Sequence, residues 1–248
     1  MQIQLNNTGK RFNREWIFRN CNYTFKAGTA YAITGPNGSG KSTLLQTIAG
    51  AINASEGSVT VYREPFTVDQ AQSVNSGNGS SVNSKRLTEY ASKTVNGKRL
   101  TVDSSKTTVN NEIRYQHLSI AAPYLELVEE MTAIEALQFH AAFKPLLPAL
   151  TIEEIIEIVG LKAAANKQMR FYSSGMKQRM KLAQAIFSDV PILLLDEPCT
   201  NLDAVGYALY HQLIENYCKE KLVIVCSNDF QEFDFCKEKL DIMDYKPK

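Results

Sequence analysis

The stretch Gly35-Pro36-Asn37-Gly38-Ser39-Gly40-Lys41-Ser42-Thr43 decides the fold of this chain. It matches the phosphate-loop pattern G-x-x-x-x-G-K-[ST] at every specified position. Its flanks match as well: residues 29–34 have the composition of a short buried strand, and residues 42–49 have the apolar spacing of a helix that Gly50 closes. A strand, a glycine-rich loop and a helix in this order predict a site for a nucleoside triphosphate.

The residue types in this loop suit phosphate chemistry. Glycines let successive backbone N–H groups turn inward around an anion, and the helix N-terminus adds a partial positive charge. Lys41 can reach the β- and γ-phosphates, and the Ser42 hydroxyl can ligate Mg²⁺. A glycine-rich turn that binds nothing is the alternative. The complete set of strand, helix, Lys and Ser argues against it, so we expect residues 35–43 to hold the phosphates.

Bulk composition narrows the class of protein. A formal charge of +1 over 248 residues gives no footprint for nucleic acid or a polyanion. No apolar run approaches membrane-spanning length, and the N-terminus lacks the apolar core of a signal peptide. The five cysteines show no C-x-x-C spacing, which indicates reduced thiols in a cytosolic protein.

The segments around the loop differ in character. Residues 1–34 alternate apolar and polar side chains, which is typical of antiparallel strands. Phe12 and Trp16 lie ahead of the phosphate loop and are candidates to stack on an adenine, with ordinary core packing as the alternative. Residues 65–111 are rich in Ser, Asn, Thr, Gly and Lys, and predict a polar surface insertion. Asn96-Gly97 predicts a hairpin inside it. A basic cluster there is either a docking patch or a solvated face: Lys85, Arg86, Lys98 and Arg99.

Residues 123–170 have no strand signal and predict a helical lobe. Two helices in it begin with a Thr that precedes a Glu by three residues, at Thr132/Glu135 and at Thr151/Glu154. Each pair is the signature of a capping box.

A second chemical stretch runs from residue 172 to residue 203. Ser173 and Ser174 are natural N-caps of a helix whose free N–H groups would suit an anion. Residues 192–195 are four apolar residues in a row, as in a strand buried on both faces. Asp196 and Glu197 follow at its C-terminal tip, where Asp196 can hold Mg²⁺ through water and Glu197 can accept a proton from an attacking water. Two solvated acids at a strand end are the alternative.

Residues 222–226 predict a further buried strand that ends near Asn228. Asp229 is expected to cap a last short helix with Glu232 as its reciprocal partner.

Together these residues resemble the nucleotide-binding subunit of an ATP-binding-cassette (ABC) transporter. The family signature Leu-Ser-Gly-Gly-Gln corresponds to residues 172–176, residues 192–197 match the acidic strand, and residues 201–203 match the loop after it. The resemblance covers all of the chain except the insertion. It implies an α/β fold: a P-loop NTPase core of mostly parallel sheet flanked by helices, with an N-terminal antiparallel β subdomain and a helical subdomain. It also implies one domain over residues 1–248, divided at 1–64, 65–111, 123–170 and 171–248.

The resemblance further implies an ATPase that uses ATP and Mg²⁺. Two copies would pair head to tail as a homodimer, with ATP between the phosphate loop of one and Ser173 and Gly175 of the other. The helical lobe would grip an integral membrane permease, which places the chain in the cytoplasm at the inner face of the membrane. The permease would select the substrate. A soluble ABC-type ATPase without transport and a slowly hydrolysing dimerisation module remain the alternatives.

Two departures from the family pattern bear on the rate. The usual Gln after the insertion is replaced by Ala122-Pro123, and Gln116 lies too early. The usual His after the last buried strand is replaced by Asn228. An Asn can hydrogen-bond a γ-phosphate or the Glu197 side chain, but it does not become a cation near neutral pH. We therefore expect slow, nonzero hydrolysis that depends on Glu197, with Lys41 and Asn228 beside it.

Overall fold

The computed structural model describes residues 1–63, 107–109 and 111–247. Its centre is a five-stranded sheet in the order β6-β7-β8-β3-β9, and every neighbouring pair in it is parallel. The strands are β3 (Ala30–Thr34), β6 (Leu118–Ala121), β7 (Ile192–Asp196), β8 (Leu222–Cys226) and β9 (Glu238–Asp241). This confirms the expected α/β fold with a mostly parallel sheet.

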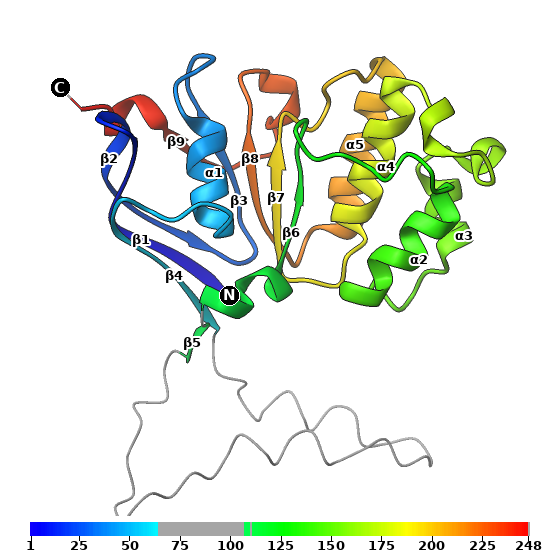
Figure 1. Cartoon of the computed structure of the whole chain (residues 1–248), viewed down its shortest axis with the longest axis horizontal. Coiled ribbons are helices and arrows are strands. Elements are labelled where there is room, and N and C mark those ends of the chain that lie inside the picture. The colour runs from blue at the N-terminus through cyan, green and yellow to red at the C-terminus, as the bar shows by residue number, and fades with distance from the viewer. Residues whose placement is uncertain (64–106, 110, 248) are drawn as a thin grey trace, which may run out of the picture.

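Helices cover both faces of this sheet (Figure 1). Helix α1 (Lys41–Ala49) lies on one face, between the two sheets of the protein. On the other face α4 (Ser174–Ile186) and α5 (Ala204–Tyr217) pack on the sheet, and α2 (Ala133–Phe143) and α3 (Ile152–Ile158) lie beyond them. None of the helices in the described ranges is long and apolar enough to cross a bilayer.

The second sheet is antiparallel and has the strand order β2-β1-β4-β5. Its strands are β1 (Gln2–Phe12), β2 (Glu15–Lys26), β4 (Glu56–Arg63) and β5 (Thr107–Val109). Strand β5 lies inside the range 65–111 that the sequence predicts as a surface insertion. Three residues are too few to give a strand signal in the sequence. The Asn96-Gly97 hairpin and the basic cluster of the insertion lie outside the described residues.

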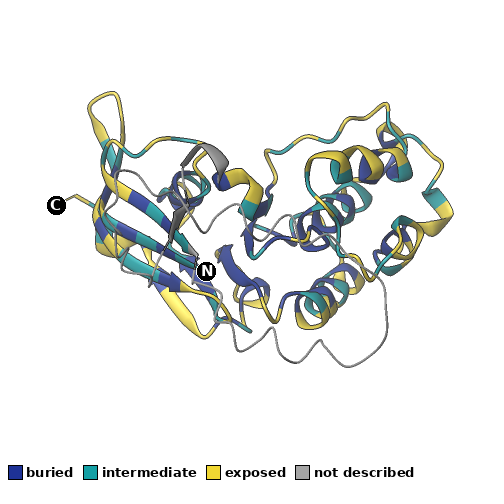
Figure 2. Ribbon diagram, turned by 90° about the horizontal axis from the view of Figure 1, so that it is seen from below, coloured by how far each residue is buried: buried dark blue, intermediate teal, exposed yellow. Residues whose placement is uncertain are grey.

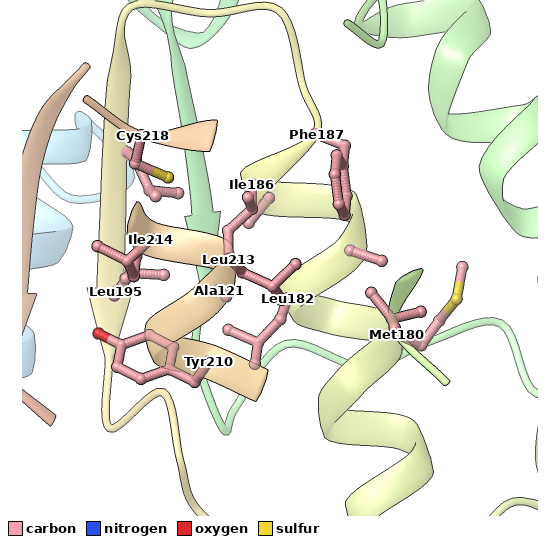
Figure 3. Packing of buried hydrophobic residues seen from close by; sticks show 14 of the residues in the cluster. Ala121, Met180, Leu182, Ile186, Phe187, Leu195, Tyr210, Leu213, Ile214 and Cys218 are labelled. Atoms are coloured by element: carbon pink, nitrogen blue, oxygen red, sulfur yellow. The ribbon is translucent and has the colours of Figure 1, made fainter. Parts of the chain in front are cut away.

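The apolar run of β7 is buried on both faces, as its sequence predicts. Leu193 and Leu195 pack with α4 and α5, whereas Ile192 and Leu194 pack with α1 and the antiparallel sheet. Figure 3 shows the first of these clusters, in which Leu195 of β7 lies beside Ile214 and Tyr210 of α5. Figure 2 shows buried positions along the strands of both sheets and on the helices, with exposed positions mainly in loops and on the outer parts of the helices. The two clusters fix β7 firmly, so the carboxylates at its end have a rigid base.

Both predicted capping boxes are present in the segment 123–170. The Thr132 hydroxyl accepts the backbone N–H of Glu135, and the Glu135 carboxylate accepts the N–H of Thr132; Thr151 and Glu154 make the same exchange. Two short 3₁₀ turns, η4 (Lys162–Ala164) and η5 (Met169–Phe171), connect α3 to α4. A 3₁₀ segment η3 (Asn111–His117) leads into β6.

The C-terminal part contains more structure than its sequence predicts. The expected last helix is a 3₁₀ turn, η6 (Phe230–Glu232), and β9 and a second turn, η7 (Ile242–Tyr245), follow it. Asp229 caps η6 as expected, by accepting the N–H of Gln231. The expected role of Glu232 is wrong: its carboxylate turns away from the cap and accepts the N–H of Cys199 at 2.7 Å. The turn is too short for a reciprocal cap, and a buried donor lies within its reach.

Candidate nucleotide site

The phosphate loop has a backbone conformation that requires glycine. Gly35, Gly38 and Gly40 have φ values of 140°, 75° and 101°, which side chains disfavour. A Cβ at Gly40 would also lie 2.3 Å from Cγ2 of Ile17 on β2. No side chain caps α1 at Gly40, so the first N–H groups of the helix remain available to an anion.

Lys41 and Ser39 supply polar groups inside the loop. The Lys41 side chain is only 5% exposed, and its ammonium donates to the carbonyl oxygens of Gly35 and Pro36 at 2.8 and 3.2 Å. The Ser39 hydroxyl is buried and has no partner in the described part of the chain. A buried polar atom without a partner is costly, which is consistent with a site that a ligand completes.

Asp196 meets the Ser42 side chain at the start of α1. Burial raises the pKa of the Asp196 carboxyl, the nearby Glu197 charge raises it further, and a hydrogen bond from Ser42 and the Lys41 charge lower it. Its Oδ1 atom is buried without a partner among the described residues. A hydroxyl and a carboxylate are hard oxygen ligands of the kind that Mg²⁺ prefers, so these two residues fit that ion.

Glu197 stands in an uncommon backbone conformation, with φ of 42°. Its N–H donates to the carbonyl of Cys226 on β8 at 2.8 Å, and its carbonyl accepts from the N–H and hydroxyl of Thr200. Across a cavity of about 320 Å³ lie Asn37 and Asn228, and the Asn228 amide donates to the Asn37 side chain. The structure therefore brings Glu197, Asn228 and the phosphate loop to one place.

The signature segment begins α4, with Ser173 as N-cap accepting the N–H of Met176 at 3.2 Å. The position of Gly175 is close to the loop after β7, since a Cβ there would lie 3.0 Å from the carbonyl oxygen of Asn201. Gly175 thus lies against the acidic loop of its own chain.

The two adenine candidates differ in their surroundings. The Phe12 ring is 49% exposed, and the Lys10 ammonium lies 4.9 Å from its centroid. The guanidinium groups of Arg11 and Arg19 lie 5.4 and 4.6 Å from the Trp16 ring. Phe12 therefore presents the freer ring.

Three functional candidates were missed from the sequence. Tyr124 follows Ala122-Pro123, where the family Gln is absent, and shares a hydrogen bond with Gln46 of α1; burial raises its pKa to about 12, and the Asp196 charge contributes. The other two, Gln178 and Glu232, contact the loop after β7. Only the Tyr directly after Ala122-Pro123 offered a sequence signal, because the other contacts join distant segments.

A parallel sheet with a phosphate loop after β3 and an Asp-Glu pair at the C-terminal end of β7 defines a nucleoside-triphosphate-binding protein of the P-loop class. The sequence profile described as ABC transporter matches residues 18–200, so the chain belongs to the ABC transporter family. It is an ATP-binding subunit of this family, whose members use ATPase activity to energise a transporter.

Individual relatives agree with this assignment. An uncharacterised ABC transporter ATP-binding protein of Bacillus subtilis, YybJ, is 27% identical over 93% of this chain and 86% of its own length. The lantibiotic transport ATP-binding protein SrtF of Streptococcus pyogenes is 23% identical over 91% and 79%. Among solved structures, the dimeric ABC transporter cassette MJ0796 superposes with a TM-score of 0.67 at 23% identity, over 97% of this chain and 94% of that one.

Proposed function

We propose that this chain hydrolyses ATP at a site made of residues 35–43, Asp196, Glu197 and Asn228. The observation that carries the proposal is that a phosphate loop lies next to an acidic strand end, and that both contain buried polar atoms without a partner among the described residues. Ser42 and Asp196 would hold Mg²⁺, which when bound neutralises charge on the β- and γ-phosphates. Phe12 is the proposed platform for the adenine ring.

Three side chains have separate roles in the proposed hydrolysis. Lys41 would exchange its two loop carbonyls for phosphate oxygens when ATP enters. Glu197 would accept the proton of a water that attacks the γ-phosphorus. Asn228 stays neutral, so it contributes a hydrogen bond and no charge to the γ-phosphate. Hydrolysis would therefore be slow.

We further propose that two copies pair head to tail, with Ser173 and Gly175 of one facing the ATP on the phosphate loop of the other. The free N–H groups at the start of α4 would then meet the γ-phosphate. Closure by ATP and release by hydrolysis would make the pair a switch.

The proposed permease contact is a groove of about 400 Å³ beside α2. Four exposed apolar residues line it: Tyr115, Val128, Phe139 and Phe143. An exposed apolar patch on a soluble surface marks an interaction site. A permease seated there would hold the chain at the inner face of the cell membrane, in the cytoplasm.

The first test is the solution mass of Glu197→Gln protein with and without ATP and Mg²⁺, and the ATPase rate of the wild type. We expect a nucleotide-dependent dimer of the Glu197→Gln protein and slow turnover by the wild type. Adding Lys41→Ala to the first should abolish the dimer, and Lys41→Ala alone should abolish turnover. A dimer without measurable turnover would support a dimerisation module instead. Turnover that Glu197→Gln leaves unchanged would remove Glu197 from the role of base.

A further inference from the structure

Two buried side chains hold opposite ends of one peptide group directly after Glu197. The carbonyl oxygen of Pro198 accepts a hydrogen bond from Nε2 of Gln178 at 2.7 Å. The N–H of Cys199, which belongs to the same Pro198–Cys199 peptide, donates to Oε1 of Glu232 at 2.7 Å. Gln178 and Glu232 are each 3% exposed. We call this arrangement the peptide clamp.

The clamp joins three elements that the proposed reaction uses. Gln178 belongs to α4, which begins at the signature segment. The held peptide lies in the loop that carries the proposed base Glu197. Glu232 ends η6, the turn that follows Asn228. A planar peptide fixed at both its carbonyl and its N–H has little freedom to rotate, so the three elements are held in one arrangement.

The loop requires such support because its backbone is strained. Glu197 and Asn201 have φ values of 42° and 66°. Non-glycine residues seldom adopt such conformations, and they keep them only where the surroundings dictate the geometry. The N–H of Glu197 is held by Cys226 of β8, and its carbonyl accepts from Thr200 within the loop. The clamp then ties the loop to α4 and η6.

Glu232 carries a cost in this place, which argues for a specific use. Burial raises the pKa of its carboxyl, and the Asp229 and Glu197 charges add to the effect, while Ser227 and the Cys199 N–H act against it. Its Oε2 atom has no hydrogen-bond partner at normal distance in the described residues, although the Ser227 hydroxyl lies near enough to favour the ionised form. The same side chain lines the cavity that holds Glu197 and Asn228.

We propose that Gln178 and Glu232 are positioning residues that orient Glu197 for hydrolysis by clamping the Pro198–Cys199 peptide. The inference rests on the proposed ATPase function and assigns no contact with ATP to either residue. It makes the start of α4, where the second copy would bind ATP, mechanically continuous with the proposed base.

The test compares two substitutions at Glu232, one that changes the charge of the side chain and one that changes its length. Glu232→Gln keeps an acceptor oxygen at the same length, whereas Glu232→Asp keeps the charge but loses the reach of one methylene. We expect Glu232→Gln to stay within about threefold of the wild-type kcat, and Glu232→Asp to lose about tenfold with the ATP Kd unchanged. Gln178→Ala releases the same peptide from the other side, so it should lower kcat as Glu232→Asp does, with the ATP Kd unchanged. If Glu232→Asp fails to fold, Gln178→Ala takes its place in the test.

Tyr210→Phe is the matched control, because the Tyr210 hydroxyl donates to the carbonyl oxygen of Glu232 at 2.9 Å and leaves the carboxylate untouched. It should lower Tm without lowering kcat. Hydrogen exchange of residues 197–203 should be faster in Glu232→Asp and Gln178→Ala than in wild type, and unchanged in Glu232→Gln.

Three results would overturn the clamp: equal kcat in the Gln and Asp variants, a loss in Tyr210→Phe as large as in Glu232→Asp, or unchanged exchange in all variants. A wild type without turnover would defeat the proposed ATPase function, and the exchange experiment would still decide whether the clamp holds the loop.

Discussion

The side-chain amide of Asn228 donates a hydrogen bond to the side-chain oxygen of Asn37 in the phosphate loop. The two residues are 191 positions apart in the chain, and both line the cavity beside Glu197. Asn228, which stands where the resemblance leads us to expect a His, therefore already touches the phosphate loop. It is placed to follow any movement of that loop when ATP binds.

Replacing Asn228 tests how far its neutral side chain limits kcat. We expect Asn228→His to raise kcat by several-fold, because an imidazolium can offer charge as well as a hydrogen bond to the γ-phosphate. The gain should fade as pH rises through about 6.5, where the ring loses its proton. A kcat–pH profile from pH 6 to 8 measures this. Asn228→Ala, which removes the amide, should lower kcat, and a rise in that variant would contradict the assignment.

The adenine platform can be tested by pairing two substitutions. Phe12→Ala should weaken ATP binding by roughly five- to thirtyfold, as the loss of about 1–2 kcal/mol of stacking predicts. Binding of inorganic tripolyphosphate, which has no base, should not change. Trp16→Ala is the matched control, since two guanidinium groups already lie against that ring. A larger loss in Trp16→Ala would make Trp16 the platform.

Asp196 gives a prediction about stability and pH. Its pKa is raised in the folded chain, mainly by burial, so the folded state binds more protons than the unfolded one. The free energy of unfolding of the nucleotide-free protein therefore falls as pH rises from the ordinary carboxyl value of about 3.9 through the raised value. Asp196→Asn removes this dependence. Its Tm at pH 7 should exceed the wild-type Tm by about 2–4 °C for each kcal/mol regained.

ATP and Mg²⁺ should reverse the order of the two Tm values, so that the wild type becomes more stable than Asp196→Asn. With ATP and Mg²⁺ the wild type gains stability by binding, and Asp196→Asn should gain much less because an amide is a poorer ligand for the ion. Thermal unfolding at pH 4 and pH 7, with and without nucleotide, measures both effects. A lower Tm for nucleotide-free Asp196→Asn at pH 7 would contradict the account of a costly buried carboxylate.

Local chemistry made much of the fold predictable from sequence. The phosphate loop encodes its own backbone through Gly35, Gly38 and Gly40, and each capping box needs only two residues three apart. The β7 run is apolar without interruption, so burial on both faces follows directly. In each case the signal lies within a few residues of the structure that it specifies.

The unpredicted features depend on contacts between distant segments. Glu232 and Cys199 are 33 positions apart, and a local cap was the nearer partner in the sequence. Strand β9 has only Leu240 buried among charged neighbours, because it lies at the edge of the sheet, so it lacks an apolar run. Long-range pairing, which no local pattern records, decides both.

The groove beside α2 gives the last prediction. Phe143 is 73% exposed and lies near Phe139, with ring centroids 5.1 Å apart. Phe143→Ser removes an apolar contact of the proposed permease site and touches no residue of the phosphate loop. The membrane-bound fraction of the chain in its native host should therefore fall, while ATP affinity stays at the wild-type value. Met243→Ser is the control, since Met243 is 45% exposed on η7, at the opposite end of the molecule. Equal membrane binding by both variants and the wild type would place the permease contact elsewhere.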